Sequence, residues 1–194
     1  MAGATAAVPG LALGQAPAAR KRIAFLGTEV RKHSHSQHFL DRLSLGYGWR
    51  GQWQDPRVDI ASVYIDQFPE GDLGRSRVKR YGQTLYPSIE EALTLGTGKL
   101  AVDGVVIIAE HGKYHRNEKG QTLYPRYEWF KRCVKVFEES GRSVPVFNDK
   151  HLSTTWARCA EMVADSKRLS FPFFAGSSLP VTRRMPSIDM PHNV

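Results

Sequence analysis

The middle of this 194-residue chain contains the almost continuous apolar run Val102-Asp103-Gly104-Val105-Val106-Ile107-Ile108-Ala109. Such a run predicts a β-strand that is buried on both faces of a sheet. Apolar residues then recur at helical spacing from Tyr127 to Ser140, and Gly141 is a typical helix stop. A short apolar strand, Val144 to Phe147, follows. This order of strand, helix and strand predicts two parallel strands joined by a helical crossover.

The same alternation extends toward both ends of the chain. Strands are predicted at Ile23 to Leu26, at Val58 to Ile65 and at Phe171 to Ala175. A helix should begin at Ser88, because Glu91 completes a capping box with it. Further helices are predicted at His38 to Leu45, Arg75 to Tyr81 and Ser153 to Leu169. The expected fold class is α/β, with an open, mostly parallel, doubly wound sheet and helices on both faces.

The composition narrows the class of protein. Apolar residues make up 41% of the chain and charged residues 24%, which is normal for a globular domain of this length. The formal charge of +8 favours anionic ligands such as phosphates. The sequence has no zinc-finger or stacking-aromatic pattern and no apolar stretch long enough to span a membrane. We therefore expect a small-molecule substrate rather than nucleic acid or a membrane, and leave self-association open.

The two ends of the chain differ from its middle. Residues 1–21 are rich in small and apolar residues and carry no charge before Arg20, as in a flexible leader or the remnant of an export signal. The second interpretation predicts a periplasmic or otherwise exported protein, and the first a cytoplasmic one. The domain itself is expected to span residues 22–178. The Pro-rich residues 179–194 are expected to form a tail or the start of a second domain.

Several side chains are expected to be structural. Cys133 and Cys159 lie on the apolar faces of predicted helices and are expected to be buried free thiols. Gly46 to Pro56 is expected to be an inserted loop, and its residues Trp49 and Trp53 to pack against the body of the domain. Stacking of these indoles on a ligand is the alternative.

Polar side chains follow the predicted strands where each strand ends. Asn148-Asp149-Lys150-His151 comes directly after one strand, Glu110-His111 after another, and Asp66 after a third. In an open α/β sheet, ligands bind just outside the carboxyl ends of the strands. We therefore predict a site along this edge of the sheet.

Histidines gather at the same predicted edge. Six of the seven lie at or after strand ends: His33, His35, His38, His111, His115 and His151. Imidazoles combined with the carboxylates of Glu110 and Asp149 are ordinary ligands of zinc and other divalent cations. No single stretch has a recognised metal-binding spacing, so a divalent metal and a set of polar surface loops remain alternatives.

The order of these segments resembles the N-terminal, Rossmann-type domain of the glucose–fructose oxidoreductase, inositol dehydrogenase and MocA (Gfo/Idh/MocA) family. The resemblance rests on Tyr86-Pro87-Ser88-Ile89-Glu90-Glu91-Ala92-Leu93, on the run from Val102 to Ala109, and on Lys150 before a Thr-rich helix start. It covers residues 22–178. It implies oxidation or reduction of a sugar or polyol with NAD or NADP as cofactor.

The resemblance also implies roles for single residues. Lys150 matches the lysine that lies beside the nicotinamide and the substrate, and its neighbour His151 is the second catalytic candidate. Asp66 matches the acidic residue that binds the adenosine ribose. The candidate cofactor contacts at these strand ends are Gly27, Thr28, Asp66, Glu110, His111 and Asn148.

The chain departs from the family pattern at the phosphate-binding turn. Gly27-Thr28-Glu29-Val30-Arg31-Lys32 stands where the family has G-x-G-x-x-G, and Glu29 replaces the glycine that lets the pyrophosphate approach. We therefore predict weak or absent dinucleotide binding by this chain alone. The leading function is an oxidoreductase that uses NAD(P) on a sugar or polyol. The alternative is a domain of the same fold that binds a different small ligand or a metal with its His, Asp and Lys side chains.

Overall fold

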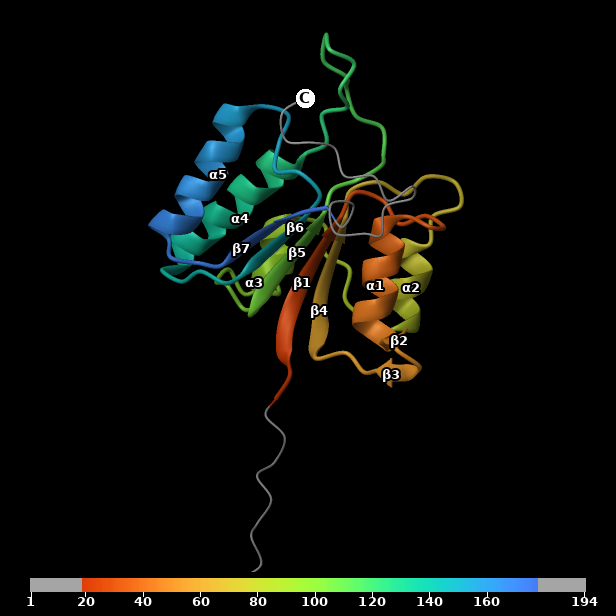
Figure 1. The fold of residues 1–194 in the computed structure, drawn as a ribbon. Coiled ribbons are helices and arrows are strands. Elements are labelled where there is room, and N and C mark those ends of the chain that lie inside the picture. The colour runs from red at the N-terminus through yellow and green to blue at the C-terminus, as the bar shows by residue number, and fades with distance from the viewer. Residues whose placement is uncertain (1–18, 178–194) are drawn as a thin grey trace, which may run out of the picture.

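A five-stranded parallel sheet forms the centre of the computed structural model, which describes residues 19–177 (Figure 1). Its strand order is β4-β1-β5-β6-β7, and each neighbouring pair is parallel. The strands are β1 (Lys21–Gly27), β4 (Val58–Ile65), β5 (Gly104–Ile108), β6 (Val146–Asp149) and β7 (Phe173–Gly176). The predicted parallel α/β sheet is confirmed.

Helices cover both faces of the sheet, as predicted (Figure 1). The helices α1 (His35–Leu45) and α2 (Gly74–Arg80) lie on one face, and α3 (Ile89–Thr94), α4 (Arg126–Ser140) and α5 (Trp156–Arg168) lie on the other. Phe25 points to the first group of helices, and its neighbours Ala24 and Leu26 point to the second. All three are fully buried, which explains why the central strands lack polar alternation.

Side-chain caps set three of the helix starts. The hydroxyl of Ser88 accepts a hydrogen bond from the amide of Glu91 at 3.1 Å, which confirms the predicted helix start at Ser88. Thr155 caps α5 instead of the residues at the predicted start near Ser153, so α5 begins later, at Trp156. Ser34 caps α1, which therefore begins before the predicted His38.

The predicted inserted loop contains a hairpin. Strands β2 (Tyr47–Trp49) and β3 (Gln52–Gln54) pair antiparallel. The residues that connect them, Arg50 and Gly51, both have positive φ, at 50° and 76°, as two-residue hairpin turns require. Trp49 and Trp53 are 60% and 62% exposed, so the expectation that they pack against the body is wrong. The hairpin satisfies its own backbone and does not need their burial.

Other predictions meet the structure in part. Cys133 is buried, whereas Cys159 is only half-buried because its part of α5 is largely exposed. Within the described residues, no helix combines the length and the apolar character needed to cross a membrane. The predicted leader and tail fall almost wholly on residues 1–18 and 178–194, outside the described part of the chain.

Candidate site at the carboxyl ends of the strands

The sheet brings the predicted site residues to one edge. Gly27 is the last residue of β1, Asp66 follows β4, and Glu110 lies two residues beyond β5. Lys150 directly follows β6. Because these strands are parallel neighbours, the residues at their carboxyl ends converge. The structure thus confirms the prediction that these residues lie along one edge of the sheet.

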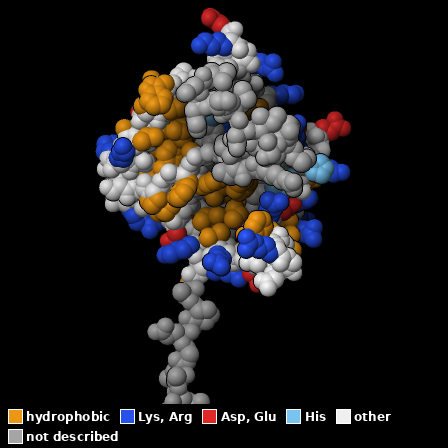
Figure 2. Space-filling model, viewed as in Figure 1, with side chains coloured by type: hydrophobic (Ala, Val, Ile, Leu, Met, Phe, Trp, Pro, Cys, Tyr) orange, Lys and Arg blue, Asp and Glu red, His pale blue; other side chains and the backbone are white. Residues whose placement is uncertain are grey.

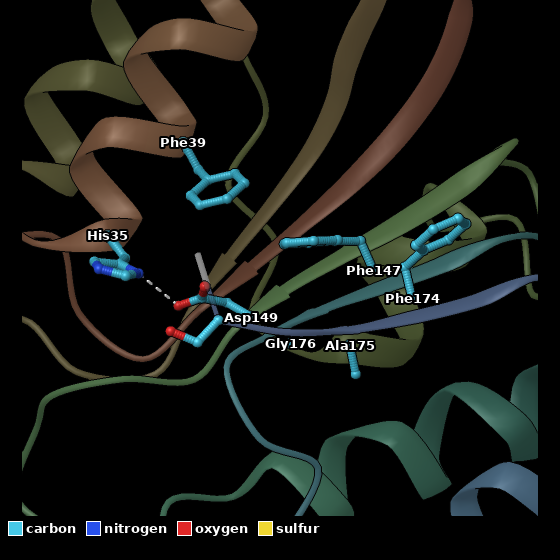
Figure 3. A pocket seen from close by; sticks show the side chains of 8 residues that line it. His35, Phe39, Phe147, Asp149, Phe174, Ala175 and Gly176 are labelled. Carbon is cyan, nitrogen blue, oxygen red and sulfur yellow. Dashed lines mark hydrogen bonds and ion pairs between the residues drawn. The ribbon is translucent and has the colours of Figure 1, made fainter. Parts of the chain in front are cut away.

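Four side chains at this edge contact one another, and we call His35, Glu110, Asp149 and Lys150 the strand-end cluster. Nδ1 of His35 lies 2.8 Å from Oδ2 of Asp149 (Figure 3). Nζ of Lys150 lies 3.0 Å from Oε1 of Glu110 and 3.4 Å from Nε2 of His35. Residues from α1, β6 and two turns therefore form one polar network.

The proton positions in this network follow from its donors. A lysine ammonium can only donate, so Nε2 of His35 accepts and its Nδ1 carries the proton that is donated to Asp149. Asp149 is buried, and the Glu110 side chain is 15% exposed. Oε2 of Glu110 is buried and has no hydrogen-bond partner among the described residues, although it lies 3.5 Å from Nδ1 of His35. One carboxylate oxygen of the cluster thus remains unused.

The turns around the cluster have unusual backbones. His33, His111 and Lys150 all adopt positive φ, at 66°, 68° and 66°. Non-glycine residues adopt this left-handed region rarely, and such strain collects at functional sites. The three residues lie in the turns after β1, β5 and β6, which are the turns that form the cluster. This coincidence favours a binding site over a set of ordinary surface loops.

His111 lies beside the cluster but faces Arg31. Nη2 of Arg31 lies 2.7 Å from Nδ1 of His111, and because arginine only donates, the ring proton is on Nε2. Partial burial lowers the pKa of His111; the carboxylate of Glu110 opposes this shift, and Arg31 adds to it. The imidazole is therefore neutral at neutral pH.

Arg126 and His151 contact each other next to the strand-end cluster, on the side of α4. Arg126, the first residue of α4, is only 3% exposed, and its Nη1 lies 3.4 Å from Nε2 of His151. Burial lowers the pKa of Arg126, while Asp149 and Glu110 oppose this shift. His151 thus contacts Arg126 rather than the cluster.

Asn148 is also turned away from the cluster. It is fully buried, and its Nδ2 donates to the carbonyl oxygen of His151 at 3.1 Å. Since side chains alternate along β6, Asp149 points to the face opposite to that of Asn148. Asn148 therefore supports the turn after β6.

A pocket of about 310 Å³ opens beside the cluster (Figure 3). His35 and Asp149 form its polar edge, and three aromatic side chains form most of the remaining wall: Phe39, Phe147 and Phe174. It lies where α1 meets β6 and β7, in a region where hydrophobic side chains gather between α5 and α1 (Figure 2). A ligand in this pocket would meet an imidazole, a carboxylate and an apolar wall.

The sequence does not single out Arg126 or His35. Arg126 is preceded by Pro125, a common neighbour of helix starts, but nothing in the sequence marks its side chain as buried. His35 was one of six candidate histidines, and its contact with Asp149 spans 114 residues. Only the length and course of the turn after β1 bring the two together.

Comparison with solved structures identifies proteins with a similar fold. The structure of GenD2 from gentamicin A biosynthesis in complex with NAD is 17% identical and has a TM-score of 0.53, covering 86% of this chain and 37% of that one. A myo-inositol 2-dehydrogenase from Lactobacillus plantarum is 14% identical at a TM-score of 0.53, over 81% of this chain and 36% of that one. A probable dehydrogenase from Thermotoga maritima is 16% identical at a TM-score of 0.51, over 80% and 35%.

This is a Rossmann-type fold. It bears out the resemblance to the N-terminal domain of the Gfo/Idh/MocA dehydrogenases at the level of the fold, which is what identities this low carry. The chain spans little more than a third of the length of the structures it matches. No protein-family model matches its sequence, and no curated protein does.

The Rossmann turn after β1 already uses two of its backbone donors within the chain. The amide of Arg31 donates to the hydroxyl of Ser34 at 3.2 Å, and the amide of His33 donates to Oε1 of Gln37 at 2.6 Å. Two backbone donors of this turn are therefore already used by the chain itself. A Cβ on Gly27 would lie 3.0 Å from the ring of Phe25, so this glycine serves close packing inside the domain.

The side chain of Glu29, which stands where the family has a glycine, is also packed into the domain. Glu29 is 6% exposed and lies 3.4 Å from Nε of Arg31, so its carboxylate is buried and paired rather than facing an open phosphate site. The neighbouring Thr28 is fully buried, and its hydroxyl donates to the carbonyl oxygen of Glu110 at 2.5 Å. Both side chains pack into the domain.

The Rossmann ribose position is also occupied by the protein. The hydroxyl of Tyr64 donates to Oδ1 of Asp66 at 2.8 Å, and that of Tyr114 donates to Oδ2 at 2.6 Å. Burial and the Asp66 carboxylate raise the pKa of Tyr64 to about 12, and the same two causes raise the pKa of Tyr114. Both phenols therefore keep their protons and donate them. The residues present do not fit a dinucleotide in the position usual for this fold.

Proposed function

We propose that this domain binds a small polar ligand at the strand-end cluster and that NAD(P) is not its ligand. The observation that carries this proposal is that two tyrosines, Tyr64 and Tyr114, donate hydrogen bonds to the carboxylate of Asp66. Its two carboxylate oxygens accept short hydrogen bonds from Tyr64 and Tyr114, so a ribose hydroxyl would compete with these donors for the same two oxygens. The loop after β5 is held there by a second contact, since the amide of Lys113 donates to Oε1 of Gln67 at 2.9 Å.

The turn after β1 supports the same proposal. A Rossmann turn binds pyrophosphate with exposed backbone amides and with glycines that let the phosphate come close. Here Ser34 and Gln37 accept hydrogen bonds from two of these amides, and Glu29 places a carboxylate in the turn. A pyrophosphate would therefore meet fewer free donors in this turn.

The strand-end cluster has the chemistry to bind a polar molecule. Lys150 supplies a cationic donor, Glu110 and Asp149 supply acceptors, and the ring nitrogens of His35 can accept or donate. Such a set can hold hydroxyl, amine or carboxylate groups and pass a proton between them. The adjoining aromatic wall adds room for an apolar part of the ligand.

An NAD(P)-dependent oxidoreductase acting on a sugar or polyol is the second candidate function. The position of Lys150 at the end of β6, within 3.0 Å of Glu110, favours it, because the family resemblance places a lysine there beside the substrate. The similar structure of GenD2 was determined with NAD. Under this function, the Tyr64 and Tyr114 contacts would open when the dinucleotide binds.

Titration of the full chain with NAD, NADH, NADP and NADPH separates the two functions. Isothermal titration calorimetry should give no saturable heat with any of the four. Asp66→Asn serves as the matched variant, since it keeps the size of the side chain and removes the charge that a ribose would use. Saturable binding that Asp66→Asn weakens would overturn the proposal and establish the second candidate.

A further inference from the structure

We propose that His35, Glu110 and Asp149 bind a divalent transition-metal ion, with one coordination position open toward the aromatic pocket. This inference rests on the proposal that the strand-end cluster is the ligand site, and it names the first ligand of that site. The three residues come from α1, from the turn after β5 and from the end of β6, so only the folded sheet edge assembles them.

The distances between the ligand atoms suit a metal ion. One ring nitrogen of His35, one oxygen of Glu110 and one oxygen of Asp149 all lie within 4.8 Å of one another. Nδ1 of His35 is 2.8 Å from Oδ2 of Asp149 and 3.5 Å from Oε2 of Glu110. Ligand atoms about 2.0–2.2 Å from a tetrahedral zinc ion lie about 3.4 Å apart, so small side-chain rotations suffice to admit the ion.

One of the three candidate ligand atoms is a carboxylate oxygen that has no hydrogen-bond partner among the described residues. Oε2 of Glu110 is buried without a hydrogen-bond partner among the described residues, whereas Lys150 contacts the other oxygen, Oε1, at 3.0 Å. A buried carboxylate oxygen without a partner is costly, and a bound cation removes that cost. Lys150 stays on Oε1 and leaves Oε2 available to an ion, but it is also a positive charge beside the proposed site.

Among residues 19–177, three side chains are the candidate ligands of this site. Nε2 of His111 lies 3.8 Å from Oε2 of Glu110, but the hydrogen bond from Arg31 to Nδ1 puts the ring proton on Nε2. Freeing Nε2 of His111 for a metal would break the 2.7 Å hydrogen bond from Arg31, whereas freeing Nδ1 of His35 breaks only the 3.4 Å contact with Lys150, so His111 stays outside the site. Three protein ligands and one open position are typical of metal sites that act on a bound molecule.

Ion binding requires one rearrangement of the network. Coordination through Nδ1 of His35 moves the ring proton to Nε2, where the ammonium of Lys150 now lies 3.4 Å away. That long contact would break, while the 3.0 Å ion pair between Lys150 and Glu110 can remain. Lys150 thus competes with the ion for part of the cluster.

The ligand types point to a first-row transition metal. Mg²⁺ and Ca²⁺ prefer sites made of oxygen alone, whereas an imidazole with two carboxylates suits Zn²⁺, Mn²⁺ or Fe²⁺. The pocket of about 310 Å³ has His35 and Asp149 in its wall, so it gives an ion a path to the site. A second molecule could complete the coordination from the side of Phe39 and Phe147.

Zinc titration of the full chain tests the proposal. After treatment with a chelator and its removal, calorimetry with Zn²⁺ should show one ion bound per chain. His35→Ala and Glu110→Gln should each weaken binding by more than about tenfold, since loss of even an outer-shell partner has that effect. His115→Ala is the matched control, because it removes an exposed histidine of the same loop region and should leave the affinity unchanged.

Each result of these titrations either supports or overturns the proposed metal site. No zinc binding by the unmodified chain, or equal binding by Glu110→Gln with the circular dichroism of the folded protein retained, would overturn the proposal. Glu110→Gln keeps the size of the side chain, so it carries the test if His35→Ala does not fold. Absence of zinc binding together with absence of NAD(P) binding would refute the metal site alone, whereas saturable NAD(P) binding would refute the proposed function itself.

Discussion

The hydroxyl of Tyr114 lies 2.6 Å from Oδ2 of Asp66, 48 residues away in the sequence. This hydrogen bond joins the loop after β5 to the end of β4 and covers the acidic residue that a Rossmann domain uses for ribose. Tyr114→Phe removes it without changing the size of the ring. We expect a loss of about 0.5–1.5 kcal/mol in the free energy of unfolding, below the usual value for a hydrogen bond to a charged group because this contact is exposed. Urea denaturation measures the loss, and an unchanged midpoint would mean that the contact is absent in solution.

Glu29→Gly restores a glycine to the turn after β1, yet it should leave NAD(P)H binding weak. Glu29 is buried against Arg31, and the turn amides remain bonded to Ser34 and Gln37. Only a combined variant that also carries Tyr64→Phe and Tyr114→Phe should gain measurable affinity. The check is a fluorescence titration of both variants with NADPH. A large gain from the glycine alone would show that the turn, rather than the tyrosine contacts, sets the limit.

Lys150→Met should tighten zinc binding by the strand-end cluster. The Lys150 ammonium lies 3.0 Å from Glu110 and is a positive charge next to the proposed ion. Its removal should raise the affinity by about tenfold, which corresponds to about 1.4 kcal/mol of repulsion in a high effective dielectric. Calorimetric titration of the variant and the unmodified chain in parallel gives the ratio. Weaker binding would instead show that Lys150 orients Glu110 for the ion.

Asp165 should contribute to stability in a pH-dependent way. Its carboxylate lies 2.6 Å from both Nζ of Lys131 and Nη2 of Arg168. Burial raises the pKa of Asp165, but the hydrogen bonds from Lys131 and Arg168 outweigh it and hold the pKa below its ordinary value. The contribution is therefore fully present above the unfolded pKa of about 3.9 and disappears as the pH falls through the lower folded pKa.

Asp165→Asn tests directly whether this contribution to stability is lost at low pH. At neutral pH we expect a loss of about 1–2 kcal/mol, at the low end for hydrogen bonds to charged groups because Lys131 and Arg168 are partly exposed. The difference between variant and unmodified chain should shrink on acidification. Urea midpoints measured from neutral pH into the acid transition give the profile. A difference that stays constant would mean that Asp165 does not titrate differently on folding.

The parallel sheet could be predicted because its strands carry their own signal. The run from Val102 to Ala109 is apolar since both faces of β5 are covered, and Gly141 ends α4 in a left-handed conformation that favours glycine. The hairpin was missed because its turn, Arg50-Gly51, lacks the Asn-Gly or Asp-Gly pair that usually marks such turns. Local sequence thus specified the buried elements better than the exposed ones.

The candidate site could be predicted only as an edge of the sheet. Parallel topology alone brings Gly27, Asp66, Glu110 and Lys150 to the same side. Which side chains meet there depends on the course of the turns, and no periodic pattern encodes that course. His35 reaches Asp149 from the start of α1 and Tyr114 reaches Asp66 from a long loop, so both contacts had to come from the folded chain.

Hydrogen–deuterium exchange of the full chain with and without saturating NADPH tests most directly whether a dinucleotide belongs in this Rossmann domain. The peptides to follow are residues 27–37, which contain the turn after β1, and residues 112–124, which contain Tyr114. If the site is closed by Tyr64 and Tyr114, NADPH should leave the exchange of both peptides unchanged. Protection of residues 27–37 together with faster exchange of residues 112–124 would show that the dinucleotide binds and displaces the loop, and would contradict the proposed function.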